Sequence, residues 1–515
     1  MSGSELLLPD EMTSRGAGEA IAARLQIEDG VHAERDRIYY DTFDGLLRDA
    51  GLTLTYADGT LSAASQETGV VVASLPMRAP SKPWFARDLP LGPLRDALSP
   101  ITDVRALLPL VRLHTQERSL SVLDDERKTV VRLALEETSL VGSDGRPDAA
   151  LRPRLRIIGI RGYDKELGRV REALVVELGF KPADQPLVDE AVRAAGGVPG
   201  GLPTKVGLPL QRDQRSDAAA AVVLRGMLEV IEANLEGAIA DIDSEFLHDL
   251  RVAVRRSRSV QRELKRAFPP DELAHYRAEF RWLQQATGDV RDLDVHVLEF
   301  DDMRALVPDA MRDDLGPLLR VLRARRVTAR RAMVRALRSK RTATLLSDWR
   351  SFLDGLEGMP VEERPDATRP IGDVSGERIR TVYRRMLKMG GAIDESSPAE
   401  AYHELRKKGK ELRYLLELFG APLFPADVVK PMIKTLKALQ DVLGRHQDRE
   451  VQIALLRSLG PSVGEAAGGD AALMAIGALV ARLGEDEGAA RREFAGRFAE
   501  FSDKHQRRLV KQTFA

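Results

Sequence analysis

The sequence has no cysteine among its 515 residues, only 5% aromatic residues and no long apolar run. Without cysteine there can be no disulfide, thiolate metal site or cysteine nucleophile, and a reducing compartment is expected. The longest apolar run, AALMAIGALVA from residue 471, stops at Arg482 and is shorter than the roughly 18 to 20 residues of a transmembrane helix. The first thirty residues lack the basic start of a secretory signal. We therefore expect a cytoplasmic protein without a membrane span.

One group of arginines has no acidic residue at helical-turn spacing. The stretch HDLRVAVRRSR contains one histidine and four arginines, although the whole chain has a formal net charge of -1. A helix turns by about 100° per residue. Four cations of this stretch would then lie on one face, within an arc of roughly 80°: His248, Arg251, Arg255 and Arg258. No acid stands three or four residues from these arginines, so the helix does not neutralise them itself. The pattern predicts counter-charge from another segment or from an anionic ligand.

This cationic pattern occurs twice. The stretch YHELRKKGKELRY carries His403, Arg406, Lys410 and Arg413, at the same intervals as the four cations of the first stretch. Downstream, RWLQQATGDVRDLDV matches LKALQDVLGRHQDREV at nearly the same displacement along the chain. The second half thus repeats the first, and a cationic stripe present in both copies predicts an anion-binding site. Guanidinium groups suit phosphate because each can donate two hydrogen bonds to its oxygens.

Residues 218–515 resemble the CHAD family, the conserved histidine α-helical domain. The two histidine stretches look like its two histidine motifs, and GDVRDLDV and GRHQDREV look like the motifs that follow them. The resemblance implies an all-α domain of two pseudo-twofold-related four-helix bundles, with basic faces around a shared cavity. It also implies binding of inorganic polyphosphate.

The basic residues of the repeated motifs are therefore the expected polyphosphate ligands. They are His248, Arg251, Arg255, Arg256, Arg258, Arg281, Arg291, His403, Arg406, Lys407, Lys410, Arg413, Lys437 and His446. Asp292 and Asp448 are expected to accept hydrogen bonds from these cations and so to orient them.

A further basic region lies outside these motifs. Residues 318–341 contain ten basic residues and no acid. We expect Arg326 and Arg330 from this segment, and Arg384 from a smaller cluster, to extend the path of a long polyanion.

The sequence of the N-terminal part indicates β-strands rather than long helices. Short β-prone runs such as GLTLTYADGTLSAAS and KTVVRLALEETSLV predict antiparallel strands. YYDTFDGLLRDAGLTL and LRIIGIRGYDKELGRV resemble segments of the CYTH or triphosphate-tunnel family. The Glu-x-Glu-x-Lys strand that holds the divalent metal in that family is missing, and Thr53, Thr55 and Tyr56 stand where it has basic residues. We expect a degenerate tunnel-barrel-like domain without catalytic residues, metal or cofactor.

The expected organisation is an α+β chain of two domains. The antiparallel β-rich domain spans residues 1–205, and a Gly- and Pro-rich linker spans 206–217. The helical domain spans 218–515. Its first repeat, loop and second repeat are residues 218–354, 355–376 and 377–515.

Three functions follow as alternatives. The first is non-enzymatic binding of polyphosphate, with cytoplasmic polyphosphate granules as a candidate location. The second is a metal-dependent triphosphatase or polyphosphatase in the N-terminal domain, which the missing carboxylate strand disfavours. The third is a helical scaffold for nucleic acid or an acidic protein. Nucleic acid is disfavoured because residues 248–267 and 318–341 contain no aromatic residue for base stacking. The oligomeric state is left open.

Overall fold

The computed structural model describes residues 4–102, 104–142, 145–201 and 209–514. Two compact units, Met1–Thr204 and Lys205–Ala515, make up the chain. The first contains an antiparallel sheet and the second is helical, which confirms the expected order of β-rich and helical regions. Residues 206–208 of the expected linker lie outside the described residues. Within those residues, no helix combines the length and the apolar character needed to cross a membrane.

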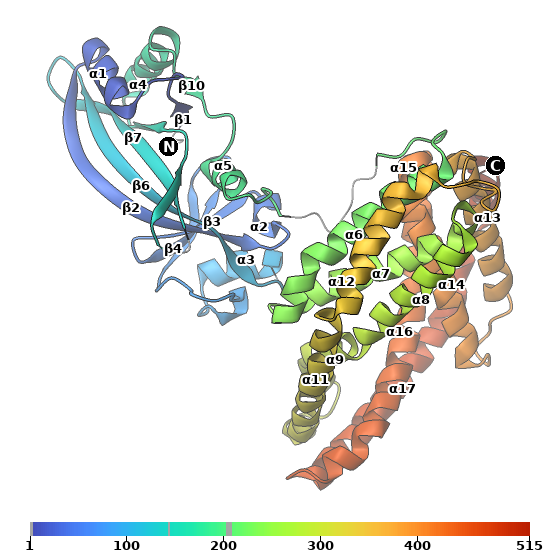
Figure 1. The fold of residues 1–515 in the computed structure, drawn as a ribbon. Helices are drawn as coiled ribbons and strands as arrows, with labels where there is room; N and C mark the ends of the chain where they lie inside the picture. The colour runs from blue at the N-terminus through green and yellow to red at the C-terminus, as the bar shows by residue number, and fades with distance from the viewer. Residues whose placement is uncertain (1–3, 103, 143–144, 202–208, 515) are drawn as a thin grey trace. The chain divides into compact units, whose positions relative to one another are not determined.

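Antiparallel strands form one sheet in the first unit (Figure 1). The described strands are β1 (Ser4–Leu7), β2 (Ile27–Thr42), β3 (Leu52–Ala57), β4 (Thr60–Ser65), β5 (Val71–Pro76), β6 (Leu107–Leu123), β7 (Thr129–Val141), β8 (Pro147–Ala150), β9 (Arg154–Gly159) and β10 (Lys181–Pro182). Their order is β10-β1-β9-β7-β6-β2-β3-β4-β5, and β8 pairs with β7. In β3, buried Leu54 stands between Thr53 and Thr55, the alternation of a strand with one face in the core.

Short helices cover the sheet. They are α1 (Ser14–Arg24), α2 (Leu46–Asp49), α3 (Pro93–Thr102), α4 (Asp164–Glu172) with a π-helical continuation (Ala173–Glu177), and α5 (Leu187–Ala194). Ile21 of α1 and Leu174 of the π-helical turn pack with β7 residues such as Leu133 in one core. Leu47 of α2 and Leu98 of α3 pack in a second core with β3 and β4. The sheet is therefore held by separate apolar clusters along its length.

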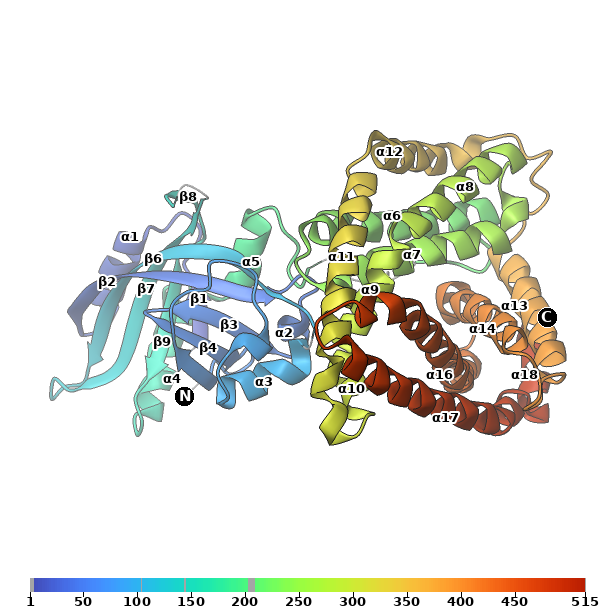
Figure 2. The same ribbon diagram turned by 90° about the horizontal axis from the view of Figure 1, so that it is seen from below.

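The second unit consists of helices that repeat in order. The longer ones are α6 (Ser216–Ala240), α7 (Ser244–Glu263), α8 (Pro270–Ala286), α9 (Gly288–Leu298), α10 (Phe300–Ala305), α11 (Gly316–Leu337), α12 (Lys340–Gly355), α13 (Ile371–Gly390), α14 (Ala399–Leu415), α16 (Ala426–Gly464), α17 (Gly469–Phe501) and α18 (Lys504–Thr513), with the short α15 (Ala421–Leu423) after α14. The second repeat begins with α13 and α14, which correspond to α6 and α7 and start at the same displacement along the chain as the two cationic stretches. Figure 2 shows α6, α7, α8 and α12 on one side and α13, α14, α16, α17 and α18 on the other.

The repeats differ where α8 ends and α9 begins, because the corresponding residues of α16 form one continuous helix. The break lies at Thr287, whose hydroxyl donates a hydrogen bond to Leu283 O at 3.0 Å. The same hydroxyl oxygen accepts a hydrogen bond from Arg251 at 3.0 Å. In the second repeat, the residue that aligns with Thr287 is Leu443, which is buried and apolar. A polar contact with Arg251 thus accompanies the break in the first repeat.

The expected loop between the repeats is shorter in the structure than in the prediction. Helix α13 already begins at Ile371, so the last residues of the predicted 355–376 loop are helical. Gly372 and Gly376 weakened the helical pattern in the sequence. In the structure a β-carbon at Gly372 would lie 3.0 Å from the backbone oxygen of Arg212, and one at Gly376 would lie 3.1 Å from that of Phe514. The two glycines therefore allow α13 to pack closely against neighbouring backbone.

Candidate anion-binding site

The first cationic stretch lies on α7. The Asp243 side chain accepts hydrogen bonds from the backbone amides of Glu245 and Phe246, which satisfies donors that the start of a helix leaves unpaired. Apolar side chains at helical spacing, among them Leu250 and Val254, are buried, and α7 packs against α6 and α8. This packing fixes the rotation of α7 about its axis and hence the direction of its cationic stripe.

The second stretch lies on α14, which packs against α13 and α16. Its apolar residues Tyr402, Leu405 and Leu412 are buried. Gly409 brings the helix close to α16, because a β-carbon at this position would lie 3.2 Å from the Gln440 side-chain nitrogen. The sequence pattern of the two helices therefore places each cationic stripe on a face that its own apolar residues do not occupy.

A cavity of about 530 Å³ brings the two stripes together. It is lined by His248, Arg251 and Arg255 of α7 and by His403, Arg406 and Lys410 of α14. The remaining lining residues belong to α9 and α16 or lie just after α9: Arg291, Asp292, Val295, His296, Glu299, Gln447, Asp448, Val451 and Gln452. Cations from equivalent positions of both repeats thus face the same space.

A second cavity, of about 440 Å³, continues from the first on the side of the second repeat. Both cavities are lined by Glu299, Arg406, Lys410, Asp448 and Gln452. The second adds Arg413, Gln440, Asp441, Gly444, Arg445 and Arg449. The fourth cation of the second stripe, Arg413, therefore lines a surface that is continuous with the shared cavity.

Two arginines of the first stripe have neutral partners. Arg251 is 9% exposed, and its Nη1 donates to Gln284 O at 2.8 Å and to Thr287 Oγ1 at 3.0 Å. Arg258 donates to the side-chain oxygen of Gln284. Burial lowers the pKa of both arginines, and the neighbouring charge of Arg255 lowers that of Arg251 further. Hydrogen bonds to neutral oxygens orient these guanidinium groups without neutralising them.

Arg255 and Lys410 occupy equivalent positions of the two repeats and both line the shared cavity. Both are part-buried, and neither forms a hydrogen bond or an ion pair with any residue in the described part of the chain. The Arg255 Nε is buried without a partner among those residues. Burial lowers the pKa of Lys410 to about 8, and the positive charges of Arg406 and Arg255 add to this effect. These two cations are therefore available to an anion.

The carboxylates in the cavity behave differently from one another. Asp448 accepts a hydrogen bond from Arg406 Nη2 at 3.1 Å, the kind of contact that the sequence predicted for it. Its counterpart Asp292 makes no hydrogen bond or ion pair with the residues that the structure describes. Burial raises the pKa of Glu299, and the negative charge of Asp448 raises it further. The acids that line this cavity thus lie on α9, on α16 or just after α9.

Imidazole groups occur on three sides of the cavity. His403 Nδ1 forms a hydrogen bond with the side-chain oxygen of Gln447, and His248 lines the cavity from α7. His296 on α9 is 7% exposed, and burial lowers its pKa.

Arg291, also on α9, lines the cavity as well. It donates a hydrogen bond to Glu245 Oε1 at 3.2 Å, so its charge is partly balanced.

Arg256 and His446, both expected to bind polyphosphate, lie away from the two cavities. Arg256 Nη2 donates to Glu417 Oε2 at 3.0 Å, because the residue after Arg255 points about 100° away from it on a helix. His446 is 1% exposed, stacks on Tyr402 with ring centroids 4.6 Å apart, and has its Nε2 2.7 Å from Glu487 Oε1. The structure therefore gives Arg256 an acidic partner and His446 a place in the packed interior.

Other expected ligands lie on the surface. Arg281 on α8, Arg384 on α13 and Lys437 on α16 are exposed. Lys407 is exposed as well and pairs with Glu404 on the same helix. None of these residues is among those that line the two cavities.

The expected path through Arg326 and Arg330 is occupied by protein carboxylates. Arg326 makes two hydrogen bonds to Asp241, at 2.6 and 3.0 Å, and one to Asp294. Arg330 also pairs with Asp241, at 3.2 Å, and donates to Ile239 O at 2.8 Å. These bonds join α11 to the end of α6 and to α9. The two residues thus hold helices together, and the prediction that they bind a polyanion is not supported by their geometry.

Sequence reasoning missed several residues that line the cavities. Arg445 and Arg449 line the second cavity and pair with Glu493 and Asp486, respectively. Both belong to the GRHQDREV motif, so their position in the motif was an available signal. His296 follows Asp292 by one helical turn, and the same spacing could have placed it beside the predicted site.

Two arginines of β9 in the first unit are neutralised by neighbouring acids. Arg154 is 2% exposed, and its guanidinium pairs with Glu5 at 2.6 Å and with Glu190 at 2.7 Å. Arg156 pairs with Glu117 at 3.0 Å and with Glu136 at 2.9 Å. In the described residues of the whole chain, no group of three His, Asp or Glu side chains is placed to hold a metal ion.

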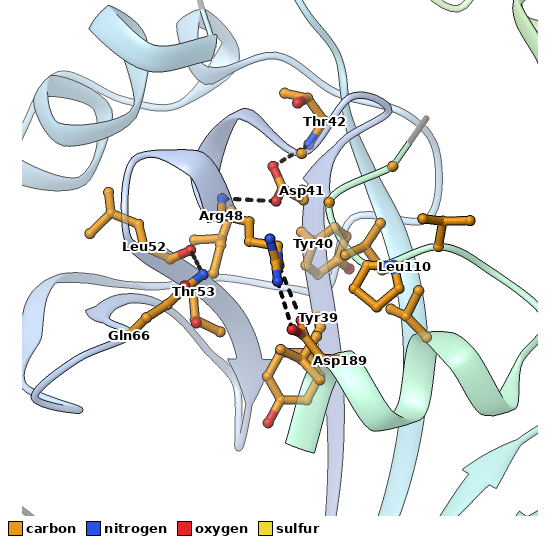
Figure 3. Close-up of a pocket in the computed structure, with 18 residues that line it drawn as sticks. Tyr39, Tyr40, Asp41, Thr42, Arg48, Leu52, Thr53, Gln66, Leu110 and Asp189 are labelled. Atoms are coloured by element: carbon orange, nitrogen blue, oxygen red, sulfur yellow. Dashed lines mark hydrogen bonds and ion pairs between the residues drawn. The ribbon is translucent and has the colours of Figure 1, made fainter. Parts of the chain in front are cut away.

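A small pocket of about 60 Å³ lies beside the Tyr-Asp-Thr segment of β2 (Figure 3). Asp41 accepts hydrogen bonds from the backbone amides of Thr42, Leu47 and Arg48, at 2.7, 2.9 and 3.1 Å. Burial raises the pKa of Asp41 to about 6. Arg48 pairs with Asp189 at 2.8 Å. Asp41 thus anchors the turn into α2, which is a structural role.

Comparison with protein families finds a match in the helical unit. Residues 222–457, which contain both cationic stripes, match the family model of the CHAD domain. This part of the chain is therefore similar to the CHAD domain.

Two uncharacterized proteins of Mycobacterium tuberculosis, MT2285 and Rv2226, are each 29% identical to the chain over 215 residues. The matched region is 40% of this chain and 39% of each of theirs, so the chain spans about two fifths of these relatives. Among solved structures, the CHAD domain from the plant Ricinus communis is 27% identical, with a TM-score of 0.48 over 57% of this chain and 95% of that one. PptA from Streptomyces chartreusis is 18% identical, with a TM-score of 0.42 over 55% and 99%.

Proposed function

We propose that the helical unit binds inorganic polyphosphate in the cavity between α7 and α14, without catalysing a reaction. The observation that carries the proposal is the pair Arg255 and Lys410, which lack partners in the described residues and face one cavity from equivalent positions. Uncompensated cations in a part-buried site favour an anion because the low local dielectric strengthens their attraction. A repeating phosphate chain offers several charges in succession, which matches cations contributed by two helices.

The lining of the cavities favours a polyanion without bases over nucleic acid. Neither cavity has a Phe, Tyr or Trp among its described lining residues. Proteins that bind single-stranded nucleic acids stack bases on such side chains. Association with polyphosphate granules in the cytoplasm would follow from the same binding.

Binding of long-chain polyphosphate to the full chain tests the proposed function. Affinity is expected to fall steeply as salt increases, because cations that contact phosphates release counterions from the ligand. Isothermal titration at several salt concentrations, with duplex DNA and RNA as competitors, measures both properties. Competition by nucleic acid that is as strong per phosphate as that of polyphosphate would replace the proposal with a general nucleic-acid scaffold. Absence of binding even at low salt would refute it.

The first unit is expected to be catalytically silent. Its arginines Arg154 and Arg156 are already paired with protein carboxylates, and metal-assisted hydrolysis needs carboxylates that converge on a divalent ion. We expect no phosphate release when the full chain is incubated with Mg²⁺ or Mn²⁺ and tripolyphosphate, ATP or long-chain polyphosphate. A turnover above about 0.1 per second would contradict this, since enzymes typically reach about 1 to 10³ per second.

A further inference from the structure

Helix α11 has an excess of positive charge that the corresponding helix of the second repeat lacks. It carries seven arginines and no acid, as its sequence GPLLRVLRARRVTARRAMVRAL shows. In the second repeat the corresponding helix is α17, which follows α16 as α11 follows α8, α9 and α10. Its arginines Arg482, Arg491 and Arg497 pair with Glu485, Glu487 and Glu493 of the same helix. The repeated fold therefore does not require an unbalanced charge on this helix.

The two faces of α11 carry arginines with different surroundings. On the inner face, Arg326 and Arg330 are held by Asp241, and Leu322 and Met333 are buried. The outer face carries exposed arginines that form no hydrogen bond or ion pair with described residues. They are Arg323, Arg325, Arg331 and Arg335, followed by Arg338 at the end of the helix.

Three of these exposed arginines form one stripe. Arg331, Arg335 and Arg338 follow one another at helical-turn spacing, which places them on the same side of a helix. Like charges at this spacing repel one another and so disfavour the helix. A repelling cationic stripe that has no partner in the described chain indicates an external anion.

The stripe belongs to a helix that adjoins the proposed binding site. Helix α11 packs directly against α9, and α9 lines the cavity through Arg291, Asp292 and His296. Figure 2 also shows α9 and α11 as neighbours. A polymer that is already held in the cavity would therefore have a high effective concentration at α11.

The chemistry of the outer face selects among possible occupants. It has no aromatic residue for base stacking. Val327 is its one large exposed hydrophobic residue within the described α11, so the face lacks the apolar stripe with which helices enter a membrane surface. The outer face is therefore suited to a flexible polyanion. Its exposed arginines can each donate hydrogen bonds to one of several successive phosphates.

We propose that long polyphosphate chains continue from the cavity onto the outer face of α11, where Arg331, Arg335 and Arg338 bind them. The inference rests on the proposed function of the cavity and adds a chain-length preference to it. Short chains occupy only the cavity, whereas long chains also contact α11. The unpaired stripe thus selects long-chain polyphosphate.

A triple variant, Arg331→Gln with Arg335→Gln and Arg338→Gln, tests this in the full chain. Affinity for long-chain polyphosphate is expected to fall at least about fivefold at low salt, because three exposed charge contacts are lost. Affinity should also depend less on salt: the negative slope of log affinity against log salt should become shallower by about two. Tripolyphosphate affinity should stay within about twofold of the unmodified protein, since its site in the cavity is intact. Thermal melts of the ligand-free proteins verify folding.

A matched control removes three charges from the equivalent helix of the second repeat, with Arg482→Gln, Arg492→Gln and Arg497→Gln. If this control weakens long-chain binding as much as the α11 variant does, bulk charge explains the effect and the inference is wrong. Unchanged long-chain affinity in the α11 variant also refutes it, while leaving binding in the cavity intact.

Two further ligands distinguish other occupants. If the α11 variant loses binding to duplex DNA or to vesicles that contain anionic lipid, yet keeps its affinity for long-chain polyphosphate, the stripe serves that other surface and the inference fails. If the unmodified full chain binds neither tripolyphosphate nor long-chain polyphosphate, the proposed function fails with it. A selective loss of long-chain polyphosphate binding supports the inference.

Discussion

Substituting Arg255 or Lys410 by alanine is expected to weaken polyphosphate binding by about 1 to 3 kcal/mol each, or roughly 5- to 150-fold. Each change removes a cation that faces the shared cavity and has no partner in the described chain. The two effects need not add, because both cations would contact the same ligand. Isothermal titration of the two single variants and the double variant measures the coupling between the repeats.

The same substitutions are expected to leave the ligand-free fold as stable as before or slightly more stable. Arg406 and Arg255 lower the pKa of Lys410, so removing either member of the Arg255 and Lys410 pair relieves repulsion. Polyphosphate that binds only the folded state should raise the melting temperature of the unmodified protein. This increase should become smaller in the variants. Loss of folding in either one would show that the cations serve the structure.

Arg262→Ala and Lys408→Ala provide matched controls on α7 and α14. Arg262 pairs with Glu263 at 2.8 Å and with Glu411 at 3.4 Å, and Lys408 pairs with Glu411 at 2.6 Å. Neither residue lines the cavities. These controls remove a charge of the same sign from the same helices, so binding should change little while stability falls slightly. Equal weakening of binding by controls and cavity variants would point to bulk electrostatics.

Local periodicity accounts for most of what could be predicted about the cavity. The helical spacing of the cations in HDLRVAVRRSR placed His248, Arg251 and Arg255 on one side of a helix, and all three line the cavity. The corresponding residues of α14 followed from the internal repeat. In both helices the apolar residues that determine the buried face are close in sequence to the cations, so the direction of the stripe was visible locally.

Partners that are remote in sequence explain the residues that the structure places elsewhere. Asp241 and Asp294 lie 85 and 32 residues from Arg326, and Glu417 lies 161 residues from Arg256. No spacing rule connects such pairs, so an arginine held by a distant acid looks the same in sequence as an unpaired one. The outer face of α11 shows the converse case, where the cations stay unpaired in the described chain.

The first unit shows the same limit for strands. The strands β3, β4 and β7 follow from short β-prone runs, but only the Tyr-Asp-Thr end of β2 was expected, because IEDGVHAERDRIYYDT is mostly charged or polar at its start. Pairing with β6 over most of its length supplies its backbone hydrogen bonds. Its buried residues are concentrated at the end, at Tyr39 to Thr42. Pairing with a neighbour, which a single segment does not reveal, therefore determines this strand.

Polyphosphate affinity is expected to decrease as pH rises above about 8, because Lys410 must be protonated to attract the anion. Burial and the charges of Arg406 and Arg255 lower the pKa of Lys410 to about 8 in the ligand-free protein. Bound polyphosphate would raise this pKa, since a neighbouring anion favours the charged form. Between the free and bound pKa values, affinity should fall by up to about tenfold per pH unit, as one proton is taken up on binding.

The ligand-free stability should change in the opposite direction over the same range. The pKa of Lys410 in the folded protein, about 8, lies below the value of about 10.4 for an unfolded chain. Between these values the unfolded chain binds more protons, so the free energy of unfolding should increase as pH rises. Titrations with polyphosphate and urea unfolding, both at pH values from about 7 to 10, measure the two trends.

Lys410→Arg is the control that isolates the lysine from other groups in the cavity. Arginine stands at the equivalent position of the first repeat, Arg255, and stays protonated throughout this range. The ligand also keeps its charge, since terminal phosphates titrate near pH 6. The Arg variant should therefore bind polyphosphate with nearly constant affinity from about pH 7 to 10. If it shows the same decline as the unmodified protein, Lys410 does not control the pH dependence, and its contact with the anion is excluded.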